Sequence, residues 1–562
     1  MGACMVVLLT GAVILGAGRW GGKSRRGSSA MDLPPCLRCE GMIFPARLKD
    51  LKPMLRLREA TMNQALHLPA YPVTEGCIGG VTEFEHTQPW IYGLDNPYLH
   101  GIYAPTTLEL NESGLHVEGE IPKDLQGSYF RNGPNPVHQP ENRYHPFDGD
   151  GMVHAVSFCE GEASYRNRYV ETVALAKEQQ AGRSTFNGVM GPFDFAASPF
   201  GIKDTSNTDL FYYAGGLMTL WYNAGHPYRL NPQTLETEGY FELEGRSHRR
   251  LSAHSKVDWA TGELLFFDYG DEPPYMTYGV ADSSGQLLHE VAIDLPGPRL
   301  PHDIGFTPNY TILHHLPFFH DPKVLQHHQL RVLTFHRDIP TRFGLIPRHG
   351  RGDDIRWFDC EPCYILHVSN CWEEGDWIVM DGCRSTNPMP SATSDEGELS
   401  HMLAYMRLEA NNYRWRFNLR TGEVREGDID DLNTEFNKTN PLYAGVKSRY
   451  AYHQRIPLLE EGGHTLRFTG LVKYDNDTGS RQQWDYGPGV YGSEAVYAPK
   501  TGATRDDDED AGYVITLVTD TRDWASRCLV FDARDITRGP VARVTLPQRV
   551  PFGFHASWAP GI

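Results

Sequence analysis

Cysteine and positive charge are both scarce in this sequence, and each shortage argues against a class of protein. Only 10 cysteines occur among 562 residues, without the spacing of a disulfide scaffold, so we expect a reduced, intracellular protein. The 52 lysine and arginine residues face 71 acidic residues, which gives a net charge of −19. A nucleic-acid partner is not expected, because phosphate binding requires a basic surface. Any contact with a membrane surface must be local and apolar.

The apolar run near the N-terminus is short for a membrane-spanning helix. It covers residues 4–18, whereas a span needs about 20 residues. Basic residues follow this run instead of preceding it, which is the reverse of a secretory signal. We interpret residues 1–30 as an anchor, a targeting segment or sequence upstream of a true start at Met31, and residues 31–95 as an N-terminal extension. The expected location is cytoplasmic or peripheral to a membrane, with organellar targeting left open.

Strict internal repeats are absent too, and the pattern that remains is typical of β-strands. From residue 96 onward, short apolar runs such as GELLFFDYG, DWIVMDGC and GYVITLVTD recur, each bounded by turn-forming residues. No long amphipathic helix interrupts residues 200–310, so alternating βαβ units are not expected. Many antiparallel strands must protect their edges, and a closed ring of four-stranded blades does so while leaving an axial channel. Residues 96–562 are assigned to this one all-β domain.

Four histidines stand in distinctive local strings: His254 in LSAHSKVD, His302 in RLPHDIGFT, His367 in YILHVSN and His555 in PFGFHASW. Their separations of 48, 65 and 188 residues are not those of ligands on one helix or loop. If they converge, they do so at the centre of a large fold. An all-imidazole site of that kind suits a redox metal such as ferrous iron.

Most histidines in a protein of this kind have no metal role, and the sequence contains 24. Neighbouring strand residues point to opposite faces of a sheet, so adjacent histidines rarely bind one metal. The two adjacent pairs in this sequence are therefore interpreted as loop residues, and they are His314/His315 and His327/His328.

The four histidine strings resemble motifs of the carotenoid cleavage oxygenase family. Further matching strings occur in the family's order and approximate spacing from about residue 96 to the C-terminus; they include GSYFRNGPNP, HPFDGDGMVH, RFGLIPRHG and SEAVYAPK. The resemblance implies a seven-bladed β-propeller with a helical and loop cap over a ferrous ion on its axis. It makes His254, His302, His367 and His555 the four iron ligands.

The resemblance also implies carboxylates that accept hydrogen bonds from the outer ring nitrogens of three ligands. Glu435 matches the partner of His367, and Glu494 matches the partner of His555. Such a carboxylate fixes the tautomer and orientation of the imidazole. Asn223 stands where a glutamate would support His302. An amide accepts the same hydrogen bond without a negative charge, so a more weakly held or more positive iron centre is expected.

The implied reaction adds dioxygen across a conjugated C=C bond and breaks it into two carbonyl products. Stilbene-cleaving relatives have a lysine that binds the phenol hydroxyl, where this sequence has Tyr222. A tyrosine is not a cation, so a carotenoid or apocarotenoid substrate is favoured over a stilbenoid. Tyr222 and Phe306 are candidate substrate-binding residues, and no catalytic side chain beyond the metal site is expected.

Two alternatives to this reaction remain. A retinoid isomerase-like activity would use the same four histidines, so the sequence barely separates it from cleavage. A non-catalytic propeller would be expected to lose at least one ligand, whereas all four are present. The expected partners are an apolar polyene and O2, and the expected oligomeric state is a monomer.

Overall fold

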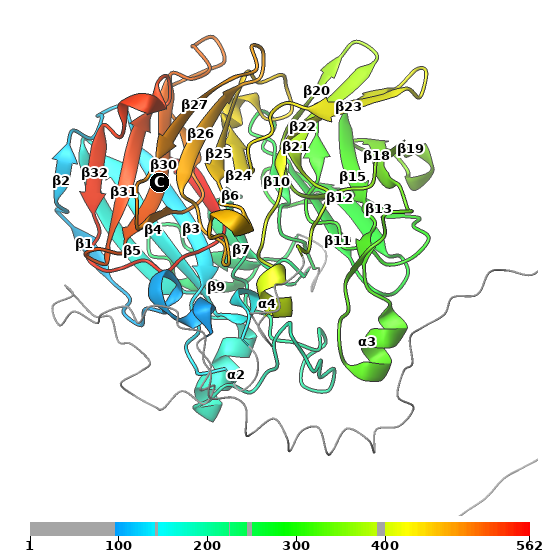
Figure 1. Cartoon of the computed structure of the whole chain (residues 1–562), viewed down its shortest axis with the longest axis horizontal. Coiled ribbons are helices and arrows are strands. Elements are labelled where there is room, and N and C mark those ends of the chain that lie inside the picture. The colour runs from blue at the N-terminus through cyan, green and yellow to red at the C-terminus, as the bar shows by residue number, and fades with distance from the viewer. Residues whose placement is uncertain (1–95, 141–143, 224, 244–249, 391–399) are drawn as a thin grey trace, which may run out of the picture. The chain divides into compact units, whose positions relative to one another are not determined.

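The computed structural model describes residues 96–562 except 141–143, 224, 244–249 and 391–399 (Figure 1). The predictions for residues 1–30 and 31–95 lie outside this range. Within it, seven sheets of at least four strands follow one another along the chain. The predicted all-β, seven-bladed propeller is therefore confirmed.

Each blade is an antiparallel sheet whose strands are named in spatial order. The first contains β1 (Asn111–Ser113), β5 (Glu162–Tyr169), β4 (Gly151–Cys159), β3 (Gly127–Pro134) and β33 (Ala556–Pro560). The second contains β6 (Asp209–Tyr213), β7 (Gly216–Leu220), β8 (Tyr228–Leu230) and β9 (Thr237–Tyr240). The third contains β10 (Lys256–Val257), β11 (Leu264–Tyr269), β12 (Met276–Ala281) and β13 (Leu287–Ile293). The fourth contains β14 (Gly305–Phe306), β15 (Tyr310–His315), β18 (Thr341–Pro347) and β19 (Arg356–Cys360).

The remaining three blades complete the ring. The fifth contains β20 (Tyr364–Glu374), β21 (Trp377–Ser385), β22 (Asn411–Asn418) and β23 (Val424–Asp428). The sixth contains β24 (Thr434–Thr439), β25 (Tyr450–Arg455), β26 (Gly470–Asp475) and β27 (Ser480–Asp485). The seventh contains β2 (Val117–Gly119), β32 (Ala542–Thr545), β31 (Ala525–Asp532), β30 (Gly512–Asp520) and β28 (Val490–Gly492), with β29 (Val496–Pro499) also paired to β30.

Both ends of the described chain take part in closing the ring. The C-terminal strand β33 pairs with β3 of the first blade, from Arg131 opposite Ala556 to Gly127 opposite Pro560. The early strand β2 pairs with β32 of the seventh blade. Closure in this way leaves no gap between the first and last blades, where an unpaired sheet edge would invite association with other chains.

Hairpin turns and the packing between blades follow from local sequence. In the strings WATGEL and LRTGEV, Gly262 and Gly422 adopt φ values of 75° and 82°, which favour glycine. Between the fourth and fifth blades, Phe343 of β18 packs against Trp415 of β22 with ring centroids 5.6 Å apart, and both rings are fully buried. Apolar contacts of this kind hold neighbouring blades at fixed positions around the axis.

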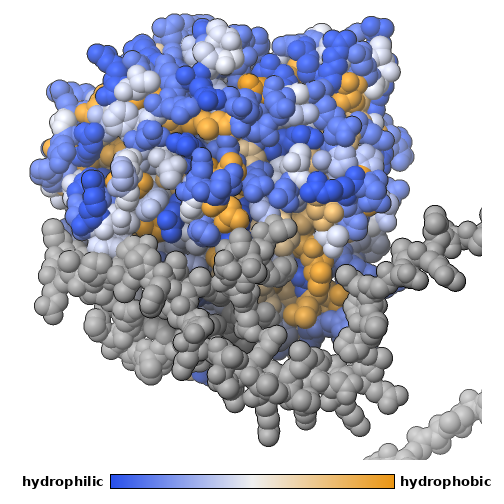
Figure 2. All heavy atoms as spheres, in the orientation of Figure 1, coloured by the Kyte–Doolittle hydropathy of each residue, from blue (hydrophilic) through white to orange (hydrophobic). Residues whose placement is uncertain are grey.

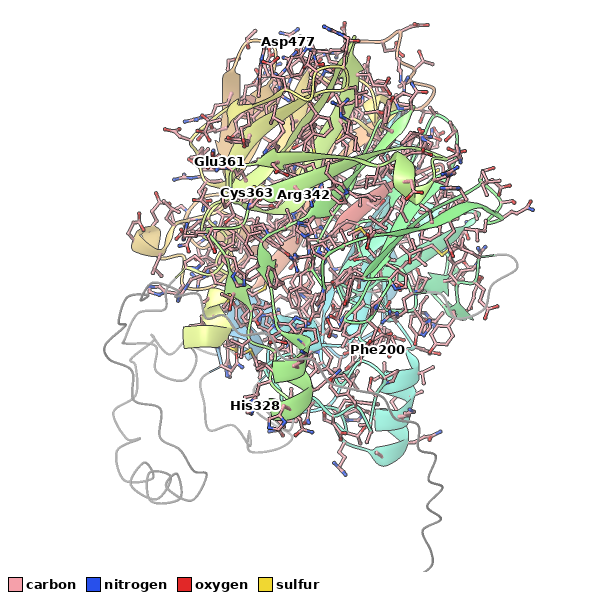
Figure 3. The ribbon with its side chains drawn as sticks, turned by 90° about the vertical axis from the view of Figure 1, so that its right-hand side faces the viewer. Phe200, His328, Arg342, Glu361, Cys363 and Asp477 are labelled. Carbon is pink, nitrogen blue, oxygen red and sulfur yellow. The ribbon has the colours of Figure 1, made fainter. Side chains whose placement is uncertain are left out.

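A cap covers one end of the propeller. It includes α2 (Val173–Ala181), α3 (Pro322–His328), α4 (Ser400–Ala404) and a hairpin of β16 (Phe318–Phe319) and β17 (Thr334–Phe335). The three helices lie on the same side of the blades in Figure 1. Figure 3 places His328 at that end and Asp477, in the turn after β26, at the opposite end. None of the helices in the described ranges is long and apolar enough to cross a membrane.

The interpretation of the adjacent histidine pairs as loop residues is wrong. His314 and His315 lie in strand β15 and are buried, with exposed fractions of 0% and 2%. His327 and His328 form the last turn of α3. The sequence offers little warning, because two consecutive histidines do not show the alternation of apolar and polar residues that marks a half-buried strand.

Candidate metal centre and adjoining cavities

Four histidines from four different blades meet at one point. Their potential ligand atoms all lie within 4.8 Å of one another, and the Nε2 atoms of His254 and His302 are 3.1 Å apart. His367 lies in β20, and the other three immediately precede the strands β10, β14 and β33. Each of these strands is at the edge of its sheet. Side chains separated by hundreds of residues are thereby brought together at the axis.

Carboxylates from the other three blades lie behind three of these histidines. Asp209 of β6 is 2.9 Å from Nδ1 of His254. Glu435 of β24 is 2.5 Å from Nδ1 of His367, and Glu494, just before β29, is 3.1 Å from Nδ1 of His555. In each pair the outer nitrogen donates to the carboxylate, so Nε2 keeps its lone pair for a metal.

Backbone hydrogen bonds fix these carboxylates as well as the histidines. Asp209 also accepts from the backbone N–H of His254, at 3.2 Å. Glu494 accepts from the backbone N–H of Ala556, the residue after His555, at 2.5 Å. His254 itself has a φ of 65°, a left-handed conformation that costs free energy for a non-glycine residue. The hydrogen bonds to Asp209 hold it there.

Asp303, next to His302, ties three of the ligand segments together. Its carboxylate is fully buried and accepts from Lys256 Nζ at 2.7 Å and from the backbone N–H of Val368 at 2.8 Å. Lys256 is two residues from His254, and Val368 follows His367. One side chain therefore sets the relative positions of the third, fourth and fifth blades at the axis.

The protein environment favours the neutral form of three of the ligands. Burial, together with the neighbouring imidazoles, lowers the pKa of His254, His302 and His367 well below the usual value for histidine. Nε2 of His367 is buried and has no hydrogen-bond partner among the described residues. Neutral imidazole nitrogens that converge without other partners are the donor set that a divalent transition metal requires, so the site fits iron.

Comparison with known proteins agrees with this geometry. The family described as "Retinal pigment epithelial membrane protein" matches residues 103–560. The chain belongs to this carotenoid oxygenase family. A carotenoid 9,10(9',10')-cleavage dioxygenase 1 of Phaseolus vulgaris is 34% identical over 496 residues, with 82% of this chain and 89% of the relative covered.

Two further similar proteins are named for compounds other than carotenoids. An isoeugenol monooxygenase of Pseudomonas nitroreducens is 30% identical and covers 83% of this chain and 98% of its own. The crystal structure of the Pseudomonas brassicacearum lignostilbene dioxygenase superposes with a TM-score of 0.73 at 27% identity, over 83% of this chain and 99% of that one. The family resemblance of the sequence motifs and the prediction of a non-haem iron oxygenase that cleaves double bonds are confirmed.

The expected hydrogen bond between Asn223 and His302 is not formed. The Asn223 amide oxygen instead accepts from the Arg331 guanidinium at 3.1 Å. No hydrogen bond to Nδ1 of His302 is found among residues that the structure describes. The amide therefore interacts with Arg331 and not with a ligand histidine. His302 is therefore the one ligand histidine without a carboxylate behind it in the described part of the chain.

Two cavities adjoin the histidine cluster, and they separate the two candidate substrate-binding residues. His302, Glu435 and Tyr222 line a mainly apolar cavity under the cap. Its apolar wall is formed by Phe147, Leu300, Pro301, Phe318, Leu333, Leu366, Pro388 and Met389. Phe306 lines a second, more polar cavity with His254, His367 and His555. Of the two candidates, only Tyr222 faces the apolar cavity.

The string PFGFH shows how a distant strand positions one ligand. Arg131 of β3 is 1% exposed and donates to the backbone carbonyl of Pro551 at 2.7 Å. A Cβ on Gly553 would collide with the Arg131 guanidinium, so glycine is required there. The backbone carbonyl of His555 then accepts from Asn132 N–H at 2.9 Å. The motifs at residues 127–136 and 551–558 are thus parts of one structure.

Three residues important for the site are missed by sequence reasoning: Asp209, Asp303 and Arg331. Asp303 lies inside the PHDIGFT string, and its adjacency to a candidate ligand is a usable signal. Asp209 and Arg331 stand in ordinary strings, NTDLFYY and QLRVL, with no spacing that relates them to a histidine. The closed ring brings Asp209 to His254, and the cap segment after α3 brings Arg331 to Tyr222.

Proposed function

We propose that this protein is an Fe(II)-dependent dioxygenase that cleaves a conjugated C=C bond of a carotenoid or apocarotenoid into two carbonyl products. His254, His302, His367 and His555 are its iron ligands, and Asp209, Glu435 and Glu494 hold three of them. The observation that carries the proposal is the convergence of four imidazoles within 4.8 Å beside an apolar cavity. The names of the relatives support the substrate class.

The protein's own part in the reaction is binding and orientation. Ferrous iron, when bound by four neutral imidazoles, supplies the activation of dioxygen. The three carboxylates keep the outer ring nitrogens protonated and the inner ones free. The apolar wall under the cap excludes water and holds a conjugated double bond beside His302, so that two reactants meet in one orientation. No side chain need act as nucleophile or general acid.

The test is aerobic incubation of the Fe(II)-loaded protein with an apocarotenal and a hydroxylated stilbene, with products identified by mass spectrometry. Aldehyde fragments from the polyene alone are expected, each labelled when ¹⁸O2 is supplied. Cleavage of the stilbene alone would assign the protein to the stilbenoid branch. An isomer or alcohol formed without O2 consumption would contradict cleavage and favour the isomerase-like alternative.

A second candidate is cleavage of a phenolic stilbenoid or phenylpropenoid. One observation favours it: the hydroxyl groups of Tyr222 and Tyr405 and the Arg331 guanidinium line the same cavity. A hydrocarbon polyene gives these groups no hydrogen bond, whereas a polar end group does. The isoeugenol and lignostilbene relatives act, by their names, on phenolic compounds. The paired incubation with polyene and stilbene separates the two substrates.

We further propose that the oxygenase domain spans residues 96–562 and acts as a monomer that touches a membrane through its cap. Phe195, Leu330 and Val332 are 48%, 41% and 53% exposed. The backbone hydrogen bond from Phe193 to Gln329 holds their two segments together. Figure 2 shows apolar areas within a mostly hydrophilic surface, including the side where the cap lies. The fraction of the protein that sediments with neutral phosphatidylcholine vesicles should fall when Phe195, Leu330 and Val332 are all changed to serine.

A further inference from the structure

Arg331 is a buried cation without a buried anion. It is 8% exposed, and none of the ion pairs formed by described residues includes it. Its Nη2 donates to the Tyr222 hydroxyl at 2.7 Å, and its Nη1 donates to the Asn223 amide oxygen at 3.1 Å. Neutral acceptors compensate a desolvated guanidinium poorly, so an uncompensated charge of this kind is costly unless something else binds it.

The carboxylate that acts on Arg331 electrostatically is already engaged. Asp148 is a source of this interaction, but its two oxygens accept from the backbone N–H groups of Val189 at 2.7 Å and His145 at 2.9 Å. Asp148 is not within ion-pair distance of the guanidinium among the contacts of the described residues. The charge on Arg331 is therefore left to face the cavity.

The guanidinium lies among groups that can donate further hydrogen bonds. Tyr222 accepts from Arg331, so its own hydroxyl proton remains to be donated, and no described residue accepts it. Burial raises the pKa of Tyr222 to about 12, so the hydroxyl keeps that proton at neutral pH. Tyr405 also hydrogen-bonds with Arg331 and lines the same cavity. The result is a charged and polar end in a mainly apolar cavity, which Arg407 and Glu409 also line.

The same cavity is lined by His302 and Glu435 of the metal centre. Phe147 stacks on the Tyr222 ring with centroids 4.3 Å apart and packs 5.3 Å from Phe554, the residue before His555. The polar end is thus connected to the iron ligands by a short series of aromatic contacts. A substrate held at one end by Arg331 would extend along apolar walls toward His302.

We propose that Arg331, with Tyr222 and Tyr405, binds a carboxylate at the end of the conjugated substrate. This inference rests on the proposed function and narrows its substrate class to conjugated acids. A guanidinium binds a carboxylate through two parallel hydrogen bonds, and the interaction is strongest where water is excluded. The carboxylate supplies the missing negative charge, and the conjugated chain fills the apolar part of the cavity.

A purely structural role for Arg331 makes a different prediction. In that case the guanidinium only attaches the segment after α3 to Tyr222 and Asn223, and its removal would affect charged and neutral substrates alike. A binding role makes the loss specific to the carboxylate. The comparison of an acid with its methyl ester separates the two roles, because the pair differs only in charge and hydrogen bonding at one end.

The experiment uses the full-length Fe(II) protein and two scaffolds, each as acid and methyl ester: an apocarotenoic acid and stilbene-4-carboxylic acid. The wild type should prefer the acid of the scaffold it cleaves by roughly tenfold to hundredfold in kcat/KM, as expected for hydrogen bonds to a charged group. Arg331→Met should abolish this preference by raising KM for the acid, with kcat/KM for the ester unchanged within about threefold. Arg331→Lys should retain part of the preference.

The control is Arg420→Met, which changes a 73% exposed arginine in the turn between β22 and β23 and should leave the preference intact. A wild type that cleaves acid and ester equally would overturn the proposal, as would an Arg331→Met variant that loses both equally while it retains iron.

Binding of dihydrostilbene-4-carboxylate, which has no double bond to cleave, is measured by calorimetry. Tight binding by the wild type and weak binding by Arg331→Met would support the carboxylate site even if neither scaffold were cleaved, in which case the proposed function alone would fail. Equal binding of this acid and its ester by the wild type would overturn the proposal.

Discussion

The four ligand histidines differ in what lies behind them. His254, His367 and His555 each donate from Nδ1 to a carboxylate, whereas no such bond is found for His302 among the described residues. An imidazole with an anionic acceptor is a stronger donor to a metal and is held in one orientation. His302 also lines the apolar cavity. The ligand nearest the proposed substrate is thus the least constrained of the four.

Removal of a supporting carboxylate should weaken iron binding. Asp209→Asn and Glu494→Gln should each lower the affinity for Fe(II) by roughly tenfold to hundredfold, because the imidazole loses an anionic acceptor. Asn223→Ala should leave the affinity unchanged within about twofold, since Asn223 bonds to Arg331. Competition with a chelator under anaerobic conditions measures all three. A loss for Asn223→Ala as large as that for Asp209→Asn would show that Asn223 supports His302 after all.

Removal of a ligand histidine should reduce iron binding more than removal of the carboxylate behind it. His302→Ala and His555→Ala should each abolish bound iron, because three imidazoles leave the metal open to water and to chelators. Metal analysis after gel filtration checks this, with His349→Ala as a control, since His349 is 50% exposed and distant in the chain from any ligand string. Full iron occupancy and normal turnover in either ligand variant would contradict the ligand assignment.

At the level of elements, each of the seven blades contributes either one ligand histidine or one carboxylate that accepts a hydrogen bond from a ligand histidine. The first, third, fourth and fifth supply histidines, and the second, sixth and seventh supply Asp209, Glu435 and Glu494. His302 comes from the fourth blade, whose two neighbours both supply histidines. His254, His367 and His555 each have a carboxylate-bearing blade beside their own. The order of blades thus accounts for the absence of a carboxylate behind His302.

The closing strand β33 has two roles, and its loss should affect both. It pairs with β3, and the backbone N–H of Ala556 at its start binds Glu494. Deletion of residues 556–562 should expose the edge of β3 and release iron. It should also lower the free energy of unfolding by roughly several kcal/mol. Urea unfolding and metal analysis provide the measurements.

The outer strand of the same blade is the matched control for this deletion. β1 is exposed along its whole length, Asn111–Ser113. Changing all three residues to alanine should alter the free energy of unfolding by no more than about 1 kcal/mol. If the deletion of β33 were as mild as these substitutions, closure of the ring would not depend on the C-terminal strand.

At the scale of the whole molecule, the sequence identifies functional residues that lie in recognisable local strings. It does not identify residues whose role depends on contacts that form only when the blades and cap assemble. The four histidines, Glu435 and Glu494 lie in strings long enough to be matched, and strand-like runs indicate the blades. In contrast, Asp209 binds a residue 45 positions away and Arg331 binds one 109 positions away. Their roles arise from the arrangement of blades and cap, which no local pattern encodes. For the same reason, the prediction that Asn223 supports His302 is wrong, since Asn223 bonds to Arg331.

At the scale of the whole molecule, two buried groups in different parts of the fold should contribute to the pH dependence of stability with opposite signs. Burial lowers the pKa of His453 to about 3 and raises the pKa of Asp204 to about 7. As the pH falls below 6.5, the unfolded state takes up a proton at the histidine first, so this contribution to stability is lost. Below pH 7 the folded state takes up a proton at Asp204 first, so stability is gained.

Single substitutions should reveal these two opposite contributions. Between pH 7.5 and 5.5 the histidine costs about 1.4 kcal/mol and the aspartate adds about 2 kcal/mol, from these pKa values and the usual ones for unfolded chains. His453→Gln should therefore gain stability relative to the wild type on acidification, and Asp204→Asn should lose it. Urea titrations at the two pH values measure the change in unfolding free energy. Parallel pH profiles for both variants and the wild type would mean that neither group keeps a shifted pKa in the folded protein.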